Sequence, residues 1–175
     1  MALTLNFRVV GVYCYLENLV FPDLSPQSTV QQVMDKIADT NANFSYHSGG
    51  SPRLVDKIQY IFDRNSKAPP NSTFPFPGTR SIENAFPNDH TAQVLQYYRS
   101  VKGKIGGQDV ELVLPTKGQP PFSQLPLNSG MPNVPGFTVS AYTLTWRLVE
   151  VPFTTATRTK FLSAKLDVLN SRAQP

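Results

Sequence analysis

The chain contains little of what most catalytic and metal sites are built from. Its 175 residues include one cysteine, Cys14, and two histidines, His47 and His90. A single thiol excludes an internal disulfide, a CxxC zinc site and an iron–sulfur cluster. Cys14 lies in an apolar stretch, where we expect a buried and inert thiol.

Long apolar runs and a high charge content are also missing. No run approaches the roughly 20 apolar residues of a membrane helix, and the N-terminus lacks the cationic and apolar regions of a signal peptide. We therefore expect a cytoplasmic protein without a membrane partner. Charged residues make up only 16% of the chain and hydrophobic residues 40%, which indicates a real core. The length predicts one domain over residues 1–175.

The two histidines do not form a catalytic pattern. His90 directly follows Asp89, and adjacent side chains seldom aim at the same point. His47 lies in a Gly/Ser-rich stretch, Tyr46–Pro52, which is typical of a loop. No HxH, HxxxH, GxxxxGK[ST] or GxGxxG spacing occurs. We therefore predict a protein that is not an enzyme, with no catalytic residue, metal or cofactor.

Apolar and polar side chains alternate at the start of the chain, which is typical of a strand with one buried face. Gly11 interrupts this pattern and predicts a bulge or a turn. Glu17–Asn18 is expected to turn the chain, and Leu19–Phe21 to return it. The apolar positions of the first strand are Leu3, Leu5, Phe7 and Val9.

A helix is predicted over Thr29–Thr40. Ser28 with Gln31 matches a capping box, and Thr29 with Gln32 offers the alternative register. Helical spacing places four apolar side chains on one face. They are Val30, Val33, Met34 and Ile37.

Further strands are predicted from alternation in the rest of the chain. They are Leu54–Asp63, Thr91–Val101, Val110–Leu114 and Thr138–Val151, with Gly106–Gly107 as a turn between the second and third. The last of them has an apolar face that we expect to point into the core. That face consists of Tyr142, Leu144, Trp146 and Leu148.

The first quarter of the chain resembles the ubiquitin-like β-grasp superfamily. The resemblance lies in the apolar strand Leu3–Val10, the return Leu19–Phe21 and the helix pattern of Ser28–Ile37. It implies a sheet with a helix packed across it. Conjugated members of that superfamily end in an exposed Gly-Gly, whereas this chain ends Ser171–Pro175, and its long Pro-rich insertions have no counterpart there. The resemblance therefore implies a non-catalytic binding module.

The predicted fold class is α+β: a mixed or antiparallel sheet of about five strands, one helix packed across it, and long Pro-rich loops. A mostly β fold is the alternative. Phe161–Leu169 decides between them, because its apolar residues fit both helical and strand spacing.

Two Pro-rich segments, near residues 68–88 and 115–136, interrupt the predicted elements. Long connections of this kind are often functional, although both could instead fold back on their own domain. If they dock on a partner, their segments Pro69–Pro77 and Pro120–Pro126 make a non-enzymatic interaction or assembly module that binds another protein or itself. The predicted contact residues are Phe74, Pro75, Phe76, Pro77, Phe86 and Phe122.

The distribution of charge supports a second hypothesis. Residues 1–90 carry 7 basic and 8 acidic side chains, whereas residues 91–175 carry 9 basic and 4 acidic ones, a net +5. Tyr98, Lys102 and Lys104 would share one face of an extended strand, with Arg99 nearby, and such a face can stack bases and bind phosphates. The alternatives are a nucleic-acid-associated or shell-type subunit, or a basic surface that only maintains solubility.

Overall fold

The computed structural model describes residues 2–50, 53–62, 67–68, 72–73, 78–87, 90–116 and 119–152. Most of these residues lie in strands, and one short helix accompanies them. The strands are β1 (Leu3–Val9), β2 (Cys14–Phe21), β3 (Phe44–Gly49), β4 (Leu54–Phe62), β5 (Lys67–Ala68), β6 (Ser72–Thr73), β7 (Gly78–Glu83), β8 (Thr91–Ile105), β9 (Gln108–Leu114) and β10 (Phe137–Pro152). The helix is α1 (Val30–Thr40), and among the described residues no helix is long and apolar enough to cross a membrane.

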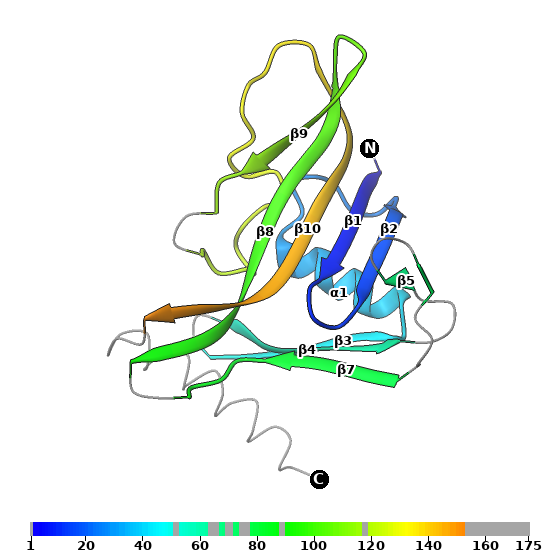
Figure 1. The fold of residues 1–175 in the computed structure, drawn as a ribbon. Coiled ribbons are helices and arrows are strands. Elements are labelled where there is room, and N and C mark those ends of the chain that lie inside the picture. The colour runs from blue at the N-terminus through cyan, green and yellow to red at the C-terminus, as the bar shows by residue number, and fades with distance from the viewer. Residues whose placement is uncertain are drawn as a thin grey trace.

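The main sheet has five strands in the order β2-β1-β10-β8-β9. Its central strands β1 and β10 are parallel, and its other neighbours are antiparallel. A second sheet, β3-β4-β7, lies beneath α1 and the five-stranded sheet, and β5 pairs with β6 (Figure 1). The predicted mixed five-stranded sheet is thus confirmed, and the mostly β alternative fits the content of the described chain.

The first hairpin turns earlier than the sequence predicts. The chain reverses between Val9 and Cys14, where Gly11 has φ +102°, a left-handed conformation that glycine adopts without steric cost. Glu17–Asn18 does not turn the chain, so that prediction is wrong. Both residues lie inside β2, where the register with β1 shifts and Asn18 adopts φ +56°. This irregularity is a β-bulge, which uses the same turn-prone residues without reversing the strand.

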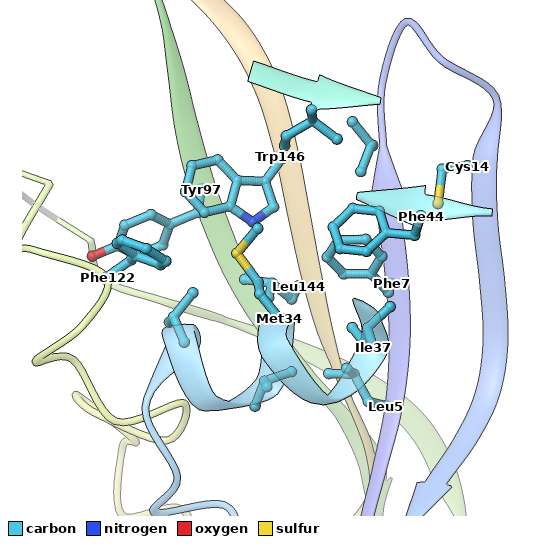
Figure 2. Close-up of a cluster of buried hydrophobic side chains, with 14 of the residues drawn as sticks. Leu5, Phe7, Cys14, Met34, Ile37, Phe44, Tyr97, Phe122, Leu144 and Trp146 are labelled. Atoms are coloured by element: carbon cyan, nitrogen blue, oxygen red, sulfur yellow. The ribbon is translucent and has the colours of Figure 1, made fainter. Parts of the chain in front are cut away.

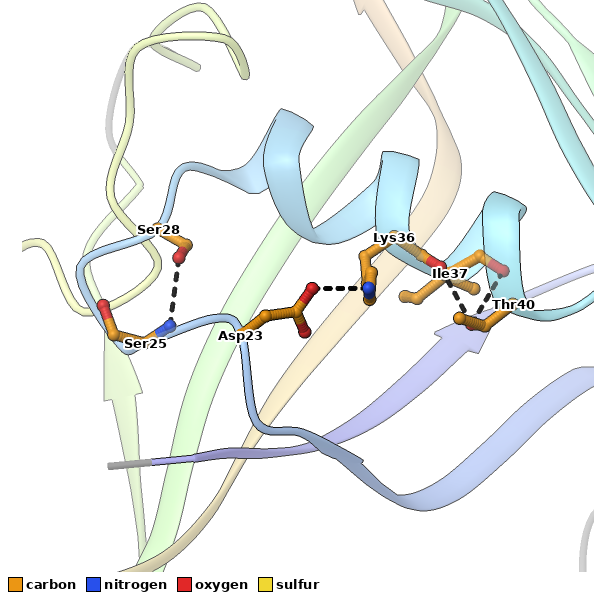
Figure 3. A network of polar contacts seen from close by, with 6 residues as sticks. All are labelled: Asp23, Ser25, Ser28, Lys36, Ile37 and Thr40. Carbon is orange, nitrogen blue, oxygen red and sulfur yellow. Dashed lines mark hydrogen bonds and ion pairs between the residues drawn. The ribbon is translucent and has the colours of Figure 1, made fainter.

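Thr29 caps α1. Its hydroxyl accepts from the Gln32 N–H at 3.2 Å, and the Gln32 amide oxygen accepts from the Thr29 N–H at 2.8 Å. The second of the two predicted registers is therefore the correct one. The Ser28 hydroxyl accepts instead from the Ser25 N–H, outside the helix (Figure 3). Figure 3 also shows the ion pair of Lys36 with Asp23, which joins α1 to the end of β2.

The β9–β10 connection, residues 115–136, accepts hydrogen bonds from backbone N–H groups at the start of α1. The N–H groups of Val30 and Gln31 donate to the carbonyl oxygens of Leu125 and Phe122, each at 2.9 Å. The first turn of a helix leaves such N–H groups without intrahelical partners. The described part of this Pro-rich segment is therefore packed on its own domain rather than extended from it.

Three other sequence predictions need correction or fall outside the described part. The predicted loop Tyr46–Pro52 begins as strand, because β3 runs to Gly49 and pairs with β4. The Pro-rich segment near 68–88 contains β7, which pairs with β4 along its length. Phe161–Leu169 lies outside the described residues.

One hydrophobic core joins both sheets and the helix. All four predicted helix residues are buried, as are Tyr142, Leu144 and Trp146 of β10, while Leu148 is partly buried against them. Aromatic rings contact one another in this core. The ring centroids of Phe7 and Phe44 are 5.0 Å apart, and those of Phe122 and Trp146 are 6.3 Å apart. Figure 2 shows Met34 and Ile37 of α1 pointing into the same cluster.

In the first half of β8, on the side where β9 does not pair with it, side-chain amides form hydrogen bonds with the backbone of β8. β9 pairs with β8 only from Arg99 onward. Before that point the side-chain amide of Gln119 accepts from the Tyr97 N–H at 3.2 Å and donates to the Tyr97 C=O at 3.1 Å. The side-chain amide oxygen of Asn84 accepts from the Leu95 N–H at 2.7 Å. These contacts satisfy backbone groups that would otherwise be costly to bury.

Candidate binding surface

The five-stranded sheet has two unlike faces. Its inner face packs on α1 and the core, and the opposite face, here called the outer face, carries the alternate residues of every strand. The outer face is open only in part. Tyr98, Lys102, Thr145 and Arg147 are partly or fully exposed on it, whereas five other outer-face residues are buried: Asn6, Ala92, Val94, Ala141 and Thr143. A sheet with antiparallel pairs often leaves one face in contact with solvent, so the chemistry of the exposed part decides whether it is a binding surface.

Tyr98 and Arg147 form a stacked pair on the outer face. The two residues stand on neighbouring strands, where Tyr98 is opposite Thr145 and Arg147 is two residues further along β10. The guanidinium carbon of Arg147 lies 4.3 Å from the centre of the Tyr98 ring. The Tyr98 hydroxyl donates to the Gln96 amide oxygen at 3.1 Å, which fixes the ring in place. Arg147 itself is exposed, so the pair presents a planar cation to solvent.

A row of residues continues this pair across the sheet. Thr145 pairs with Tyr98 on one side and with Arg8 of β1 on the other, and Arg8 pairs with Tyr15 of β2. Burial raises the pKa of Tyr15, and the charge of Arg8 acts against that rise. From the edge strand β2 to β8, this row therefore consists of Tyr15, Arg8, Thr145 and Tyr98.

Lys102 and Lys104 extend the positive surface along β8. They alternate with the inner-face residues of that strand, as Tyr98 does, which confirms the predicted shared face. Two carboxylates border them on β9: Asp109 lies 3.7 Å from the Lys104 ammonium, and Glu111 accepts from the Ser100 hydroxyl at 2.7 Å. Both carboxylates are on the edge strand, so the outer positions of β1, β10 and β8 carry four cations and no acid.

Arg99 does not belong to this surface, contrary to the nucleic-acid hypothesis. It points to the inner side and is only 1% exposed. Its guanidinium donates to the carbonyl oxygens of Pro115, Pro126, Leu127 and Ser129 at 2.7 to 3.2 Å. Burial lowers the pKa of Arg99 from its ordinary value. The residue is a structural clamp on the β9–β10 connection.

Phe122 is likewise an internal residue, so its predicted role as a partner contact is wrong. It is 2% exposed and packs edge-on against both Trp146 and Tyr46. Apolar burial on its own core accounts for this phenylalanine without a partner. Phe86 is half-buried just after β7. The other predicted contacts, Phe74, Pro75, Phe76 and Pro77, lie outside the described residues.

A polar groove between α1 and β3 contains His47, one of the two histidines of the chain. It has a volume of about 460 Å³ and is lined by Asp35, Tyr46, His47 and Arg53 among others. The Tyr46 hydroxyl donates to the Asp35 carboxylate, and burial followed by this contact raises the Tyr46 pKa. Arg53 donates to the Ser48 hydroxyl at 3.1 Å. No group of three potential metal ligands gathers anywhere in the described residues.

Cys14 is expected to be unreactive in the folded protein. It is fully buried, and burial raises the pKa of its thiol far above the ordinary value. Because the thiolate is the reactive form and the folded protein shields the thiol, a thiol reagent should label the native protein far more slowly than the unfolded protein at the same pH. Urea-unfolded protein is the control and should react at once. Fast labelling of the native protein would contradict this burial.

The comparisons with known proteins place no further constraint on this surface. No family model, no curated protein and no solved structure matches the chain. The surface must therefore be interpreted from its own residues.

Three members of the outer face were not predicted as site residues: Arg8, Tyr15 and Arg147. The alternation of Thr138–Val151 does contain a signal for Arg147, because a core face with Trp146 puts Arg147 on the other side. The order of the strands, by contrast, is not visible in local alternation. It alone brings Arg8 of the first strand beside β10.

Proposed function

We propose that the protein is a non-enzymatic interaction module that binds an acidic partner through the outer face of its five-stranded sheet. The observation that carries this proposal is the set of cations on β1, β10 and β8, namely Arg8, Arg147, Lys102 and Lys104, interleaved with tyrosines. Tyrosine and arginine are the residues that contribute most to binding surfaces.

The proposal keeps the class of function expected from the sequence. It places the contact surface on the outer face of the sheet instead of on the Pro-rich segments. The described part of the second Pro-rich segment is bound to α1 and to Arg99, which leaves it unsuited to dock as a free arm. We also infer a β-grasp-like core. The hairpin β1–β2, the capped helix α1 and the sheet that it packs on follow the order that the resemblance implies.

Charge reversal tests the surface. In the double variant Lys102→Glu with Arg147→Glu, binding of a heparin-derived decasaccharide should weaken by at least about tenfold, because two attractive contacts become repulsive. Titration followed by two-dimensional amide NMR should place the shifted resonances of the wild type on β1, β8 and β10.

The matched control is Arg53→Glu with Lys57→Glu, which changes the net charge equally but lies away from the outer face, because Arg53 directly precedes β4 and Lys57 lies within it. This variant should keep nearly wild-type binding. An equal loss in both double variants, or no binding of the wild type at low salt, would contradict a specific outer-face site. Circular dichroism and urea unfolding check that each variant is folded.

A further inference from the structure

The stacked Arg147–Tyr98 pair offers more than positive charge. A guanidinium is planar, and the guanidinium carbon of Arg147 lies over the ring of Tyr98, 4.3 Å from its centre. Arg147 is exposed, and the ring beneath it is tied to Gln96. The plane is therefore held ready before a ligand arrives, which lowers the entropy cost of stacking another flat group on it. An arginine plane of this kind is a recognised platform for an unpaired base.

Phosphate-binding groups lie at a fixed distance from this platform. Lys102 and Lys104 follow Tyr98 on the same face of β8, at four and six residues, which corresponds to roughly 13 and 20 Å along an extended strand. On the other side of the platform Arg8 stands on β1, next to Thr145. The ion pair of Lys104 with Asp109 is exposed and long, so a phosphate can displace it at little cost.

We infer that the outer face binds single-stranded nucleic acid, with a base stacked on Arg147 and the backbone phosphates on Lys102 and Lys104. The inference rests on the proposed function of this face and names its partner class. A line of cations beside an aromatic platform is the arrangement that single strands need, because their bases are free to stack. The carboxylates of Asp109 and Glu111 repel a polyanion from β9 and so direct its path along β8, β10 and β1.

Fluorescence anisotropy with four labelled probes tests this inference on the full chain. The probes are a mixed-sequence single-stranded 12-mer, an abasic 12-mer with the same phosphates, a 12-base-pair duplex and deca-glutamate. We expect the single-stranded 12-mer to bind at least about tenfold more tightly than the abasic one at 50 mM salt, since only the single strand has bases that can stack on Arg147. The duplex and deca-glutamate should bind more weakly than the single strand.

Two variants separate stacking from charge. Arg147→Lys keeps the charge but removes the plane, so it should weaken the single strand far more than the abasic probe and thereby abolish the advantage of the single strand. Lys102→Ala should weaken both probes by a similar factor and reduce the slope of log affinity against log salt by about 0.7.

The outcomes distinguish this inference from the proposed function. If the abasic probe or deca-glutamate binds as tightly as the single strand, the face binds acidic partners without reading bases, and the nucleic-acid inference is wrong while the proposed function stands. If the duplex binds most tightly, the inference is also wrong. If none of the four probes binds, both proposals fail.

Discussion

Replacing Arg99 by methionine should lower the free energy of unfolding by about 3–5 kcal/mol, among the largest effects of any single substitution in this chain. Four carbonyl oxygens of the β9–β10 connection accept from this one guanidinium. Methionine fills a similar volume but donates nothing, so these oxygens lose their charged donor, and each buried acceptor left unsatisfied costs about 1–3 kcal/mol. Removal of a desolvated charge offsets only part of this cost. Urea unfolding followed by tryptophan fluorescence measures the change.

Arg147→Met is the matched control, because it removes the same side chain from the outer face. Arg147 is exposed and contacts only the Tyr98 ring among its described interactions, so its loss should cost less than about 1 kcal/mol. Arg99→Lys adds a second test. An ammonium has three donors at one point and cannot span the separate carbonyls of Pro115 and Ser129, so this variant should also be strongly destabilised. Near-wild-type stability of both Arg99 variants would contradict the clamp.

Phe122→Ala should lower the free energy of unfolding by about 3–5 kcal/mol, as expected for a buried phenylalanine. The ring contacts Trp146 and Tyr46, and its backbone carbonyl accepts from the Gln31 N–H of α1. A cavity at this position therefore loosens the connection, the helix start and the core together. Thermal unfolding should also shift to a lower midpoint.

This variant separates the two roles that Phe122 could have. A residue that contacts only a partner would leave the stability of the isolated protein unchanged. Val113→Ala provides the reference, because Val113 is 79% exposed and its truncation should stay within about 0.5 kcal/mol. If Phe122→Ala behaved like Val113→Ala, the internal role of the ring would be wrong.

Both residues show where local sequence patterns stop being informative. Phe122 stands among prolines, and nothing in a Pro-rich segment states whether its apolar side chain faces the domain or a partner. Arg99 directly follows Tyr98, and this adjacency in the sequence was the reason to place it near the basic face, although neighbouring residues of a strand point to opposite faces. Only the packed connection shows that four carbonyls surround Arg99, because those acceptors come from residues 16 to 30 positions away.

The sequence by itself determined the elements whose signals are local. Apolar spacing and the two capping registers defined α1, and alternation defined β1, β4, β8 and β10. For β1 and β10 alternation also identified the face that packs in the core. These predictions succeed because backbone geometry repeats every 3.6 or every 2 residues, so neighbouring residues carry the whole signal.

Only the tertiary structure decided which strands become neighbours. The parallel pairing of β1 with β10 joins residues more than 130 positions apart, and it places Arg8 and Tyr15 in one surface with Tyr98 and Arg147. The same long-range packing withdrew Arg99 and Phe122 into the interior. The candidate surface therefore depends on contacts between distant segments, whose free energy comes from burial and hydrogen bonding in the assembled fold and from no single stretch of sequence.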